Sequence, residues 1–271
     1  MADAAGSYPG EGGAGDGPVI LLSYAHSGAG RVQEVLAENA GLACTVGTGI
    51  IPLCAAAAET WRRVEGNDGQ AMSRLAAASV RGLVTAQVTA ILAGTGKARW
   101  CELAVSDPGA VQPFIQMFPH AAVVCVHRGC LDMVRARVAA SPWGLQGPGL
   151  EPYLLSYHGN SVAALAAYWA NAAEGLLAFE DANPQITRRV RYEDAAGDQG
   201  EAVAALRAWL RLDGGPGGAF SGQFRPAERD QMAFASPGPE VPVEMIPPPL
   251  RQRVSRLHDR LGYPPLPQVA S

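Results

Sequence analysis

The stretch LLSYAHSGAGRV, residues 21–32, decides the fold. It begins inside an apolar run that starts at Val19, passes through a turn rich in Ser and Gly, and continues with apolar residues at helical spacing from Val32 to Leu36. Apolar, partly β-branched runs of this kind are typical of buried parallel strands. The stretch therefore predicts a strand, a tight turn and a helix.

The turn between the two elements is a candidate anion site. Backbone amides at the start of a helix point at whatever binds there, and the helix dipole adds partial positive charge, so phosphate or sulfate is the favoured ligand. Gly28 and Gly30 let the backbone come close to such a ligand. Further donors are the hydroxyl of Ser27 and the side chains of His26 and Arg31. The turn alone leaves open the alternative of glycines that serve only packing.

A second segment, AAVVCVHRGCLDMVR at residues 121–135, repeats the order of strand, turn and helix, and its strand ends in the cation Arg128. Strands that alternate with helices predict an α/β fold with a central parallel sheet flanked by helices. The remaining elements that we expect are helices over residues 59–93, 110–118, 161–180 and 200–211, a strand over residues 188–192, and loops over residues 144–152 and 214–249.

Together the two segments resemble the phosphosulfate-binding segments of sulfotransferases that use 3'-phosphoadenosine 5'-phosphosulfate (PAPS). The family motif Tyr-Pro-Lys/Arg-Ser-Gly-Thr-Thr-Trp is similar to residues 24–31, and Arg-Asn/Asp-Pro-x-Asp-Val is similar to residues 128–133. Weaker similarities, to the Trp-Gly-Asp/Glu-Lys segment, the Arg/Phe-Tyr-Glu-Asp strand end and the closing helix, lie at residues 99–103, 191–194 and 250–263. The resemblance covers residues 18–265 and implies a single domain with a P-loop-like, nucleotide-kinase-like fold.

The resemblance also implies how PAPS is bound. The donor's 5'-phosphate is held by the loop, and its 3'-phosphate by Arg128 and by the position of Ala136, where the family has Ser. Tyr192 contacts the adenine. The loop residues that the resemblance assigns to PAPS are Ser27, Gly28, Ala29, Gly30 and Arg31.

Several positions depart from the family pattern. His26 stands where the family has Lys or Arg, so it supplies a cation only when protonated, or otherwise donates one neutral hydrogen bond. Arg31 replaces Trp, and its planar guanidinium can still stack on adenine. Leu103 replaces a Lys. The missing Ser at Ala136 has three candidate substitutes, which are Arg135, Arg137 and Ser141.

A general base must accept the acceptor's proton within hydrogen-bond reach. Glu102 is the first candidate, because it lies in the segment that resembles Trp-Gly-Asp/Glu-Lys and follows Trp100, an aromatic residue that can desolvate it. Glu59 and His158 are the second candidates. Each of them is also readily explained as a solvated charge or a loop residue.

Length and composition fit one cytoplasmic domain. The chain has 271 residues and 48% hydrophobic content, enough for a substantial core. We expect residues 1–17, dominated by Gly, Ala and Asp, to be a disordered tail and residues 18–271 to form the domain. A net charge of −4 with scattered cations argues against nucleic acid as a partner. Apolar stretches break before about 18 residues and no signal-peptide pattern opens the chain, so we expect no membrane contact.

The cysteines argue against both metal and disulfides. They are odd in number and lack paired metal-ligand spacing. Cys130 replaces a family Pro in the second turn, where we interpret it as a packing residue. The five cysteines are Cys44, Cys54, Cys101, Cys125 and Cys130.

The leading hypothesis is therefore a PAPS-dependent sulfotransferase that sulfonates a hydroxyl or amine of a small molecule in bacterial specialised metabolism, such as antibiotic biosynthesis. One version is sulfation that turns a hydroxyl into a leaving group for ring closure. The alternatives are a small-molecule kinase, although residues 94–97 do not complete a Gly-x-x-x-x-Gly-Lys-Ser/Thr motif, and a catalytically weakened nucleotide-binding scaffold. The expected partners are the acceptor and, as an option, a second copy in a homodimer.

Overall fold

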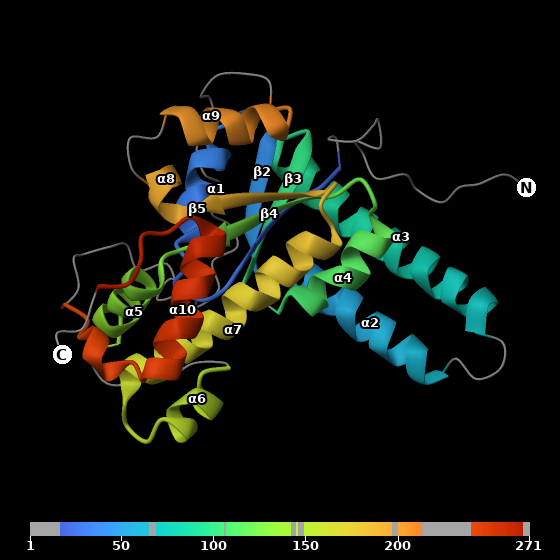
Figure 1. Ribbon diagram of the computed structural model, residues 1–271. Helices are drawn as coiled ribbons and strands as arrows, with labels where there is room; N and C mark the ends of the chain where they lie inside the picture. Colours follow the sequence, from blue (N-terminus) through green and yellow to red (C-terminus); the bar gives the residue numbers. More distant parts are fainter. Residues whose placement is uncertain are drawn as a thin grey trace, which may run out of the picture.

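A computed structural model describes residues 17–64, 69–105, 107–141, 145, 149–196, 200–212 and 240–267. Its centre is a five-stranded sheet in the order β2-β3-β1-β4-β5, in which every neighbouring pair is parallel (Figure 1). The strands are β1 (Val19–Ser23), β2 (Leu42–Val46), β3 (Arg99–Val105), β4 (Ala122–His127) and β5 (Thr187–Arg191).

The strand order places the end of β1 at a topological switch point. The chain leaves β1 toward β2 and β3 on one side, and later continues through β4 to β5 on the other side. In open parallel sheets, ligands bind in the crevice at the carboxyl ends of the strands, where the order reverses. The turn after β1, which contains the candidate anion site, therefore lies where this architecture puts its ligands.

Helices cover both faces of the sheet (Figure 1). One apolar cluster joins the sheet to α1, α8 and α9, and the other joins it to α2, α3, α4, α5, α7 and α10. The helical elements are α1 (Ala29–Ala37), α2 (Ile50–Val64), α3 (Gly69–Thr95), α4 (Pro108–Met117), α5 (Cys130–Ala139), α6 (Glu151–Ser156), α7 (Ser161–Ala182), α8 (Tyr192–Ala196), α9 (Gly200–Trp209), the 3-10 turn η2 (Val243–Met245) and α10 (Pro248–Leu261).

The central strand is apolar on both faces because both are buried. Val19 and Leu21 pack toward α1 and its neighbours, whereas Ile20 and Leu22 pack toward α7, and all four side chains are fully buried. Side chains along a strand alternate between faces, so a continuous apolar run is what a sheet covered on both sides requires. This confirms the predicted α/β fold with its central parallel sheet.

Local sequence signals fix where three helices begin or end. Asp107 caps α4 by accepting a hydrogen bond from the Gly109 amide at 2.6 Å. Asn160 does the same for α7 through the Ala163 amide at 3.0 Å. Gly262 ends α10 in the left-handed conformation, at φ 72°. Short polar side chains at helix starts and glycine after helix ends satisfy backbone groups that the helix leaves unpaired.

Several predicted boundaries need correction. The helical region expected over residues 59–93 consists of α2 and α3, and α2 begins earlier, at Ile50. The predicted strand over 188–192 stops at Arg191, and Tyr192 opens α8. In the loop expected over residues 144–152, Glu151 already begins α6, while residues 142–144 and 146–148 lie outside the described residues. Strands β2 and β3 were not predicted; residues 99–103 of β3 were identified only as a segment that resembles a family motif.

The structure describes only part of the two segments that we expected to be irregular, residues 1–17 and residues 214–249. Of the tail expected over residues 1–17, the structure describes Gly17, which is buried and whose carbonyl accepts a hydrogen bond from Arg99 Nε at 2.6 Å. Gly17 therefore belongs to the domain rather than to a disordered tail. Of the loop expected over residues 214–249, only residues 240–249 are described, and they contain η2 and the start of α10.

Two helices are long and apolar enough to cross a membrane by length and composition, which the sequence analysis did not anticipate. They lie at residues Arg74–Thr95 of α3 and Ser161–Ala182 of α7. In α7, 67% of the apolar window is buried, compared with 28% in α3. Core helices of globular proteins share this length and hydropathy, and α7 is such a helix because it packs against the sheet.

Candidate functional site

The turn after β1 leads directly into the N-terminus of α1. Gly28 caps this helix with φ 81°, a left-handed conformation that favours glycine. A β-carbon at this position would lie 2.1 Å from Cδ2 of Tyr192, so glycine is also needed for space. Ser27 Oγ accepts a hydrogen bond from the Ala29 amide at 3.3 Å. The Arg31 amide donates to the Gly28 carbonyl at 3.0 Å. First-turn amides that have no acceptor within a helix can donate hydrogen bonds to an anion near Gly28.

Tyr24 connects this turn to the second predicted segment. Its hydroxyl accepts a hydrogen bond from the Arg128 amide at 2.9 Å and donates one to the Arg128 carbonyl at 2.9 Å. Trp169 Nε1, from α7, donates to the same carbonyl at 2.7 Å. Burial raises the pKa of Tyr24 far above its usual value, so the hydroxyl stays protonated. The ends of β1 and β4 are therefore fixed to each other.

Arg128 lies between the two segments and is buried, with 5% of the residue exposed to solvent. Its Nη1 donates to the His26 carbonyl at 3.2 Å, and its Cζ lies 4.4 Å from the ring centroid of Tyr192. Its Nε is buried and has no hydrogen-bond partner among the residues described. Buried polar groups are rarely left unpaired, so this donor fits a site whose ligand is an anion.

His26 is a second buried donor. It is 4% exposed, and its Nε2 lies 3.0 Å from Arg137 Nη1. A guanidinium only donates hydrogen bonds, so Nε2 must accept and Nδ1 carries the proton. In the described part of the chain, Nδ1 has no partner. Burial, followed by the charges of Arg137 and Arg128, lowers the pKa of His26 to about 4. His26 is therefore neutral near pH 7 and serves as a hydrogen-bond donor.

The candidate substitutes for the family Ser differ in where they lie. Ala136 is buried on α5, and Arg135 forms an ion pair with Asp132 at 2.8 Å on the surface. Arg137 reaches His26 in the loop after β1. Ser141 follows α5 and is half-buried. Of these side chains, Arg137 is the one that the structure brings to the loop.

Tyr192 and its neighbours bind the second turn to the first. The Tyr192 ring lies against Gly28 on one side and under the Arg128 guanidinium on another. Glu193 Oε1 accepts a hydrogen bond from the Gly129 amide at 2.8 Å, and its Oε2 accepts one from the Tyr263 hydroxyl at 3.0 Å. The predicted motif at residues 191–194 thus contacts both turns, the one after β1 and the one after β4.

Glu102, the first candidate for general base, is buried in a network of its own. Its Oε2 accepts a hydrogen bond from Thr45 Oγ1 at 2.5 Å, and its Oε1 accepts from the amide and the hydroxyl of Thr48, each at 2.9 Å. Trp100, the predicted desolvating neighbour, donates from Nε1 to Thr45 Oγ1 at 2.7 Å. Both carboxylate oxygens are therefore engaged in holding the turn that follows β2.

The second candidates for general base lie on the surface. Glu59 forms ion pairs with Arg62 at 2.6 Å and with Arg63 at 2.9 Å on an exposed face of α2. His158 is exposed in the turn before α7, with φ 43°. Neither residue lines the cavity described next.

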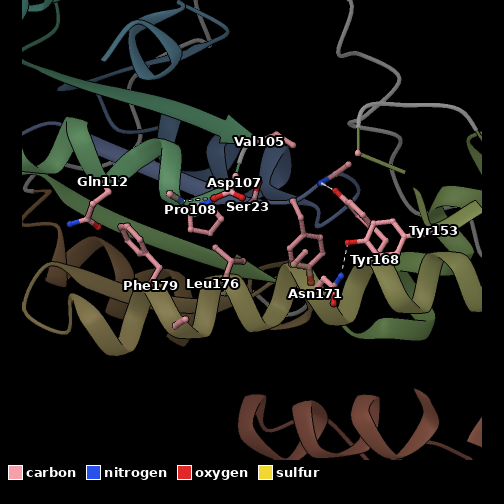
Figure 2. Close-up of a pocket in the computed structure, with 17 residues that line it drawn as sticks. Ser23, Val105, Asp107, Pro108, Gln112, Tyr153, Tyr168, Asn171, Leu176 and Phe179 are labelled. Carbon is pink, nitrogen blue, oxygen red and sulfur yellow. Dashed lines mark hydrogen bonds between the residues drawn. The ribbon is translucent and has the colours of Figure 1, made fainter. Parts of the chain in front are cut away.

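A cavity of about 770 Å³ opens beside the turn after β1, between α4 and α7 (Figure 2). Ser23, Tyr24 and Ala25 line it, so it is continuous with the candidate anion site. The Ala25 amide donates to the hydroxyl of Tyr168 at 3.3 Å. The ring of Tyr168 packs edge-on against Tyr153, with centroids 5.8 Å apart. Most of the other lining is apolar, and it includes Val105, Pro108, Leu176 and Phe179.

Asp107 is a residue that the sequence analysis missed. Among the described residues that line the cavity, it is the one with a carboxylate. It follows β3, whose last residue, Val105, pairs in register with Ser23, and it lies near Ser23 in Figure 2. The signal available in the sequence was a carboxylate followed by Pro108 directly after an apolar strand, which also marks the cap of α4.

The cysteines take no part in this site. All five are buried and unpaired as disulfides. Burial raises the pKa of Cys130, at the start of α5, well above its usual value, which makes its thiol unreactive. Within the described ranges, no group of three or more His, Cys, Asp and Glu side chains is arranged to hold a metal ion.

The parallel sheet, the glycine-containing turn after its central strand and the adjoining cavity define an α/β protein with a P-loop-like fold. The chain belongs to the sulfotransferase family, whose sequence model matches residues 18–214. Family membership supports a transferase activity, and this family generally uses PAPS as donor. No curated protein matches the chain significantly.

Solved structures agree with the fold. A sulfotransferase domain from the curacin biosynthetic pathway matches with a TM-score of 0.59 and 12% identity, covering 92% of this chain and 98% of that one. A sulfotransferase domain from the Synechococcus PCC 7002 olefin synthase matches with a TM-score of 0.52 and 15% identity, covering 92% and 95%. At these identities the similarity shows a shared fold.

Proposed function

We propose that this chain transfers the sulfonate group of PAPS to a hydroxyl or amine of a small-molecule acceptor. The observation that carries the proposal is a pair of buried, unpartnered donors, His26 Nδ1 and Arg128 Nε, beside the N-terminus of α1. Donors of this kind fit the phosphates of PAPS, and the family match favours PAPS over other nucleotides.

The residues around these donors suit the parts of PAPS. The amides from Ser27 to Arg31 would hold the 5'-phosphate, because they open α1. The amides of Ser27, Ala29 and Arg31 would exchange the acceptors that they have now for phosphate oxygens. Arg128 would bind the 3'-phosphate, since its guanidinium stays charged and offers planar donors. Tyr192, whose ring reaches the edge of both segments, would contact the adenine. Arg31 has its own surface ion pair with Glu34 at 3.1 Å, which an adenine contact would have to displace.

The cavity beside the turn suits the acceptor. Its apolar lining and its tyrosine hydroxyls favour an uncharged small molecule with an aromatic or aliphatic body. Bound PAPS supplies an activated sulfonate: its sulfur forms a bond to the acceptor oxygen as its bond to the phosphate oxygen breaks, and 3'-phosphoadenosine 5'-phosphate (PAP) leaves. Positioning and electrostatics dominate such a transfer.

We assign the acceptor's proton to Asp107. Its carboxylate lies in the wall of the cavity, where an acceptor hydroxyl can approach it. Glu102 is the alternative from the sequence analysis, and it must give up hydrogen bonds to Thr45 or Thr48 to act as a base. The transfer rates of variants at Asp107 and at Glu102 distinguish which of the two carboxylates is the general base.

The shared fold with sulfotransferase domains of the curacin pathway and of an olefin synthase supports our proposal for the biological setting. We propose a role in bacterial specialised metabolism, including antibiotic biosynthesis, and a cytoplasmic location. Sulfation that activates a hydroxyl as a leaving group is one chemical purpose that this proposal includes.

The test is a transfer assay with PAPS that carries a radiolabelled sulfonate, incubated with the protein and a panel of small alcohols, phenols and amines. Label recovered in an organic product, and lost when Arg128 is replaced by Ala, is the expected result. A parallel incubation with ATP labelled on its terminal phosphate tests the kinase alternative. Transfer from ATP, or PAPS binding with no transfer to any compound or to water, would contradict the proposal.

A further inference from the structure

The position that the family fills with a cation holds a neutral imidazole here. His26 is buried, its Nε2 accepts a hydrogen bond from Arg137, and its Nδ1 carries the proton. Resting on the proposed function, we propose that Arg137 of α5 supplies the positive charge at the 5'-phosphosulfate, and that His26 positions its guanidinium.

Two guanidinium groups contact His26, one at its imidazole ring and the other at its backbone carbonyl. Arg137 Nη1 lies 3.0 Å from the imidazole, and Arg128 Nη1 donates to the His26 carbonyl at 3.2 Å. Arg128 turns toward Tyr192, against whose ring it stacks. The two guanidiniums therefore approach the loop from different elements, β4 and α5, and need not serve the same phosphate.

His26, which Arg137 contacts, directly follows Ala25 in the wall of the acceptor cavity. Burial raises the pKa of Tyr168, and the hydrogen bond from the Ala25 amide and the charge of Arg137 lower it. Tyr168 lines the cavity and accepts a hydrogen bond from the Ala25 amide. A sulfonate on its way to an acceptor in the cavity would pass this point, so a cation here can stabilise the charge that develops on the leaving oxygen.

An alternative role for Arg137 is to replace the missing Ser at the 3'-phosphate, because it is the residue after Ala136. Adjacent residues of a helix point about 100° apart. Ala136 is buried, whereas the Arg137 guanidinium is directed at His26 in the loop that would hold the 5'-phosphate. This direction of the side chain favours a contact of Arg137 with the 5'-phosphosulfate over a contact with the 3'-phosphate.

The affinities of three nucleotides distinguish these two roles of Arg137, and no acceptor is needed to measure them. The nucleotides are PAP, adenosine 5'-phosphate and adenosine 3'-phosphate. We expect Arg137→Ala to weaken PAP and adenosine 5'-phosphate by the same factor, about tenfold, because a charge-assisted hydrogen bond is lost. Affinity for adenosine 3'-phosphate should not change. Arg137→Lys should recover part of the loss. Arg135→Ala is the matched control, because Arg135 lies on the same helix but pairs with Asp132 on the surface, and it should leave all three affinities unchanged.

A second measurement follows His26 itself by imidazole NMR. In the unliganded wild type the ring should remain neutral with Nδ1 protonated at pH 6, and Arg137→Ala should raise its pKa toward the ordinary range because one of the charges beside it is gone. An Arg137→Ala variant that loses affinity for adenosine 3'-phosphate, or that loses none, would overturn the inference. If the wild type binds PAP no better than adenosine, the proposed function fails first, which is a distinguishable outcome.

Discussion

The hydroxyl of Tyr24 bonds both backbone groups of Arg128, accepting from the amide and donating to the carbonyl, each at 2.9 Å. These residues are far apart in the sequence, at the ends of β1 and β4. Beyond the ladder that pairs β1 with β4, this buried side chain helps to fix the separation of the two segments that we assign to the two phosphates of the donor. Binding of both phosphates depends on this separation, since neither segment can move alone.

Replacement of Tyr24 by Phe removes the hydroxyl and leaves the buried Arg128 amide without its acceptor. We expect the free energy of unfolding to fall by about 1–3 kcal/mol, the usual effect of one unsatisfied buried donor, together with weaker PAP binding. Urea denaturation and calorimetry measure the two effects. Tyr153→Phe is the control, because its hydroxyl bonds Asn171 at an exposed position. Equal losses in the two variants would contradict the connecting role of Tyr24.

Replacement of Arg128 by Ala should reduce PAP affinity by about tenfold or more, because a charged, bidentate donor is lost. The loss should be smaller for adenosine 5'-phosphate, which lacks the 3'-phosphate. Arg188→Ala, a change at an exposed arginine of β5, controls for the overall charge. Unchanged PAP affinity in Arg128→Ala, measured by calorimetry, would rule out this assignment.

His26 predicts a specific pH dependence of stability. In the unfolded chain a histidine protonates near pH 6.5, whereas the folded protein lowers the pKa of His26 to about 4. Between these values the unfolded state binds more protons, so His26 destabilises the fold as the pH falls from 7 to 4, by up to about 3 kcal/mol.

The variant His26→Asn isolates this contribution, because Asn does not titrate and tolerates the positive φ of 62° at this position. Urea unfolding of both proteins at several pH values should show the wild type losing more stability than the variant below pH 6. Parallel curves would mean that His26 titrates normally in the folded protein.

The two candidate bases, Asp107 and Glu102, should respond differently when each carboxylate is replaced by the corresponding amide. Asp107→Asn keeps a good helix cap for α4 but removes the proposed base, so the transfer rate should fall about a hundredfold or more with PAP affinity and stability unchanged. Glu102→Gln places an amide donor among donors from Thr45 and Thr48, so it should cost about 1–3 kcal/mol of stability. Transfer rates and urea unfolding of both variants are the measurements. A full transfer rate in Asp107→Asn would return the assignment to Glu102.

The fold was predictable in its main features because buried parallel strands are recorded directly in the sequence. β1 and β4 are continuous apolar runs, each followed by a glycine turn and a helix. β2, Leu42–Val46, was missed because it is short and contains Ala, Cys and Thr, whose burial arises only from pairing with β3. The start of α8 at Tyr192 is likewise decided by contacts with Gly28 and Arg128 rather than by local propensity.

The candidate site was predictable where the backbone itself forms the site. Glycines and a strand-to-helix turn are visible in a sequence, so the loop from Ser27 to Arg31 could be found. The roles of carboxylates could not, because Glu102 on β3 and Asp107 just after it are close in sequence, yet one is enclosed by threonines and the other faces the cavity. The contact between His26 and Arg137 also depends on how α5 packs beside β1.

The central claim, that this chain binds PAPS to transfer its sulfonate, is tested most directly by calorimetric titration with PAP, compared with adenosine 5'-phosphate and ATP. We expect tight binding of PAP, much weaker but measurable binding of adenosine 5'-phosphate, which lacks the 3'-phosphate, and weak or no binding of ATP. Failure to bind PAP, or a preference for ATP, would contradict it.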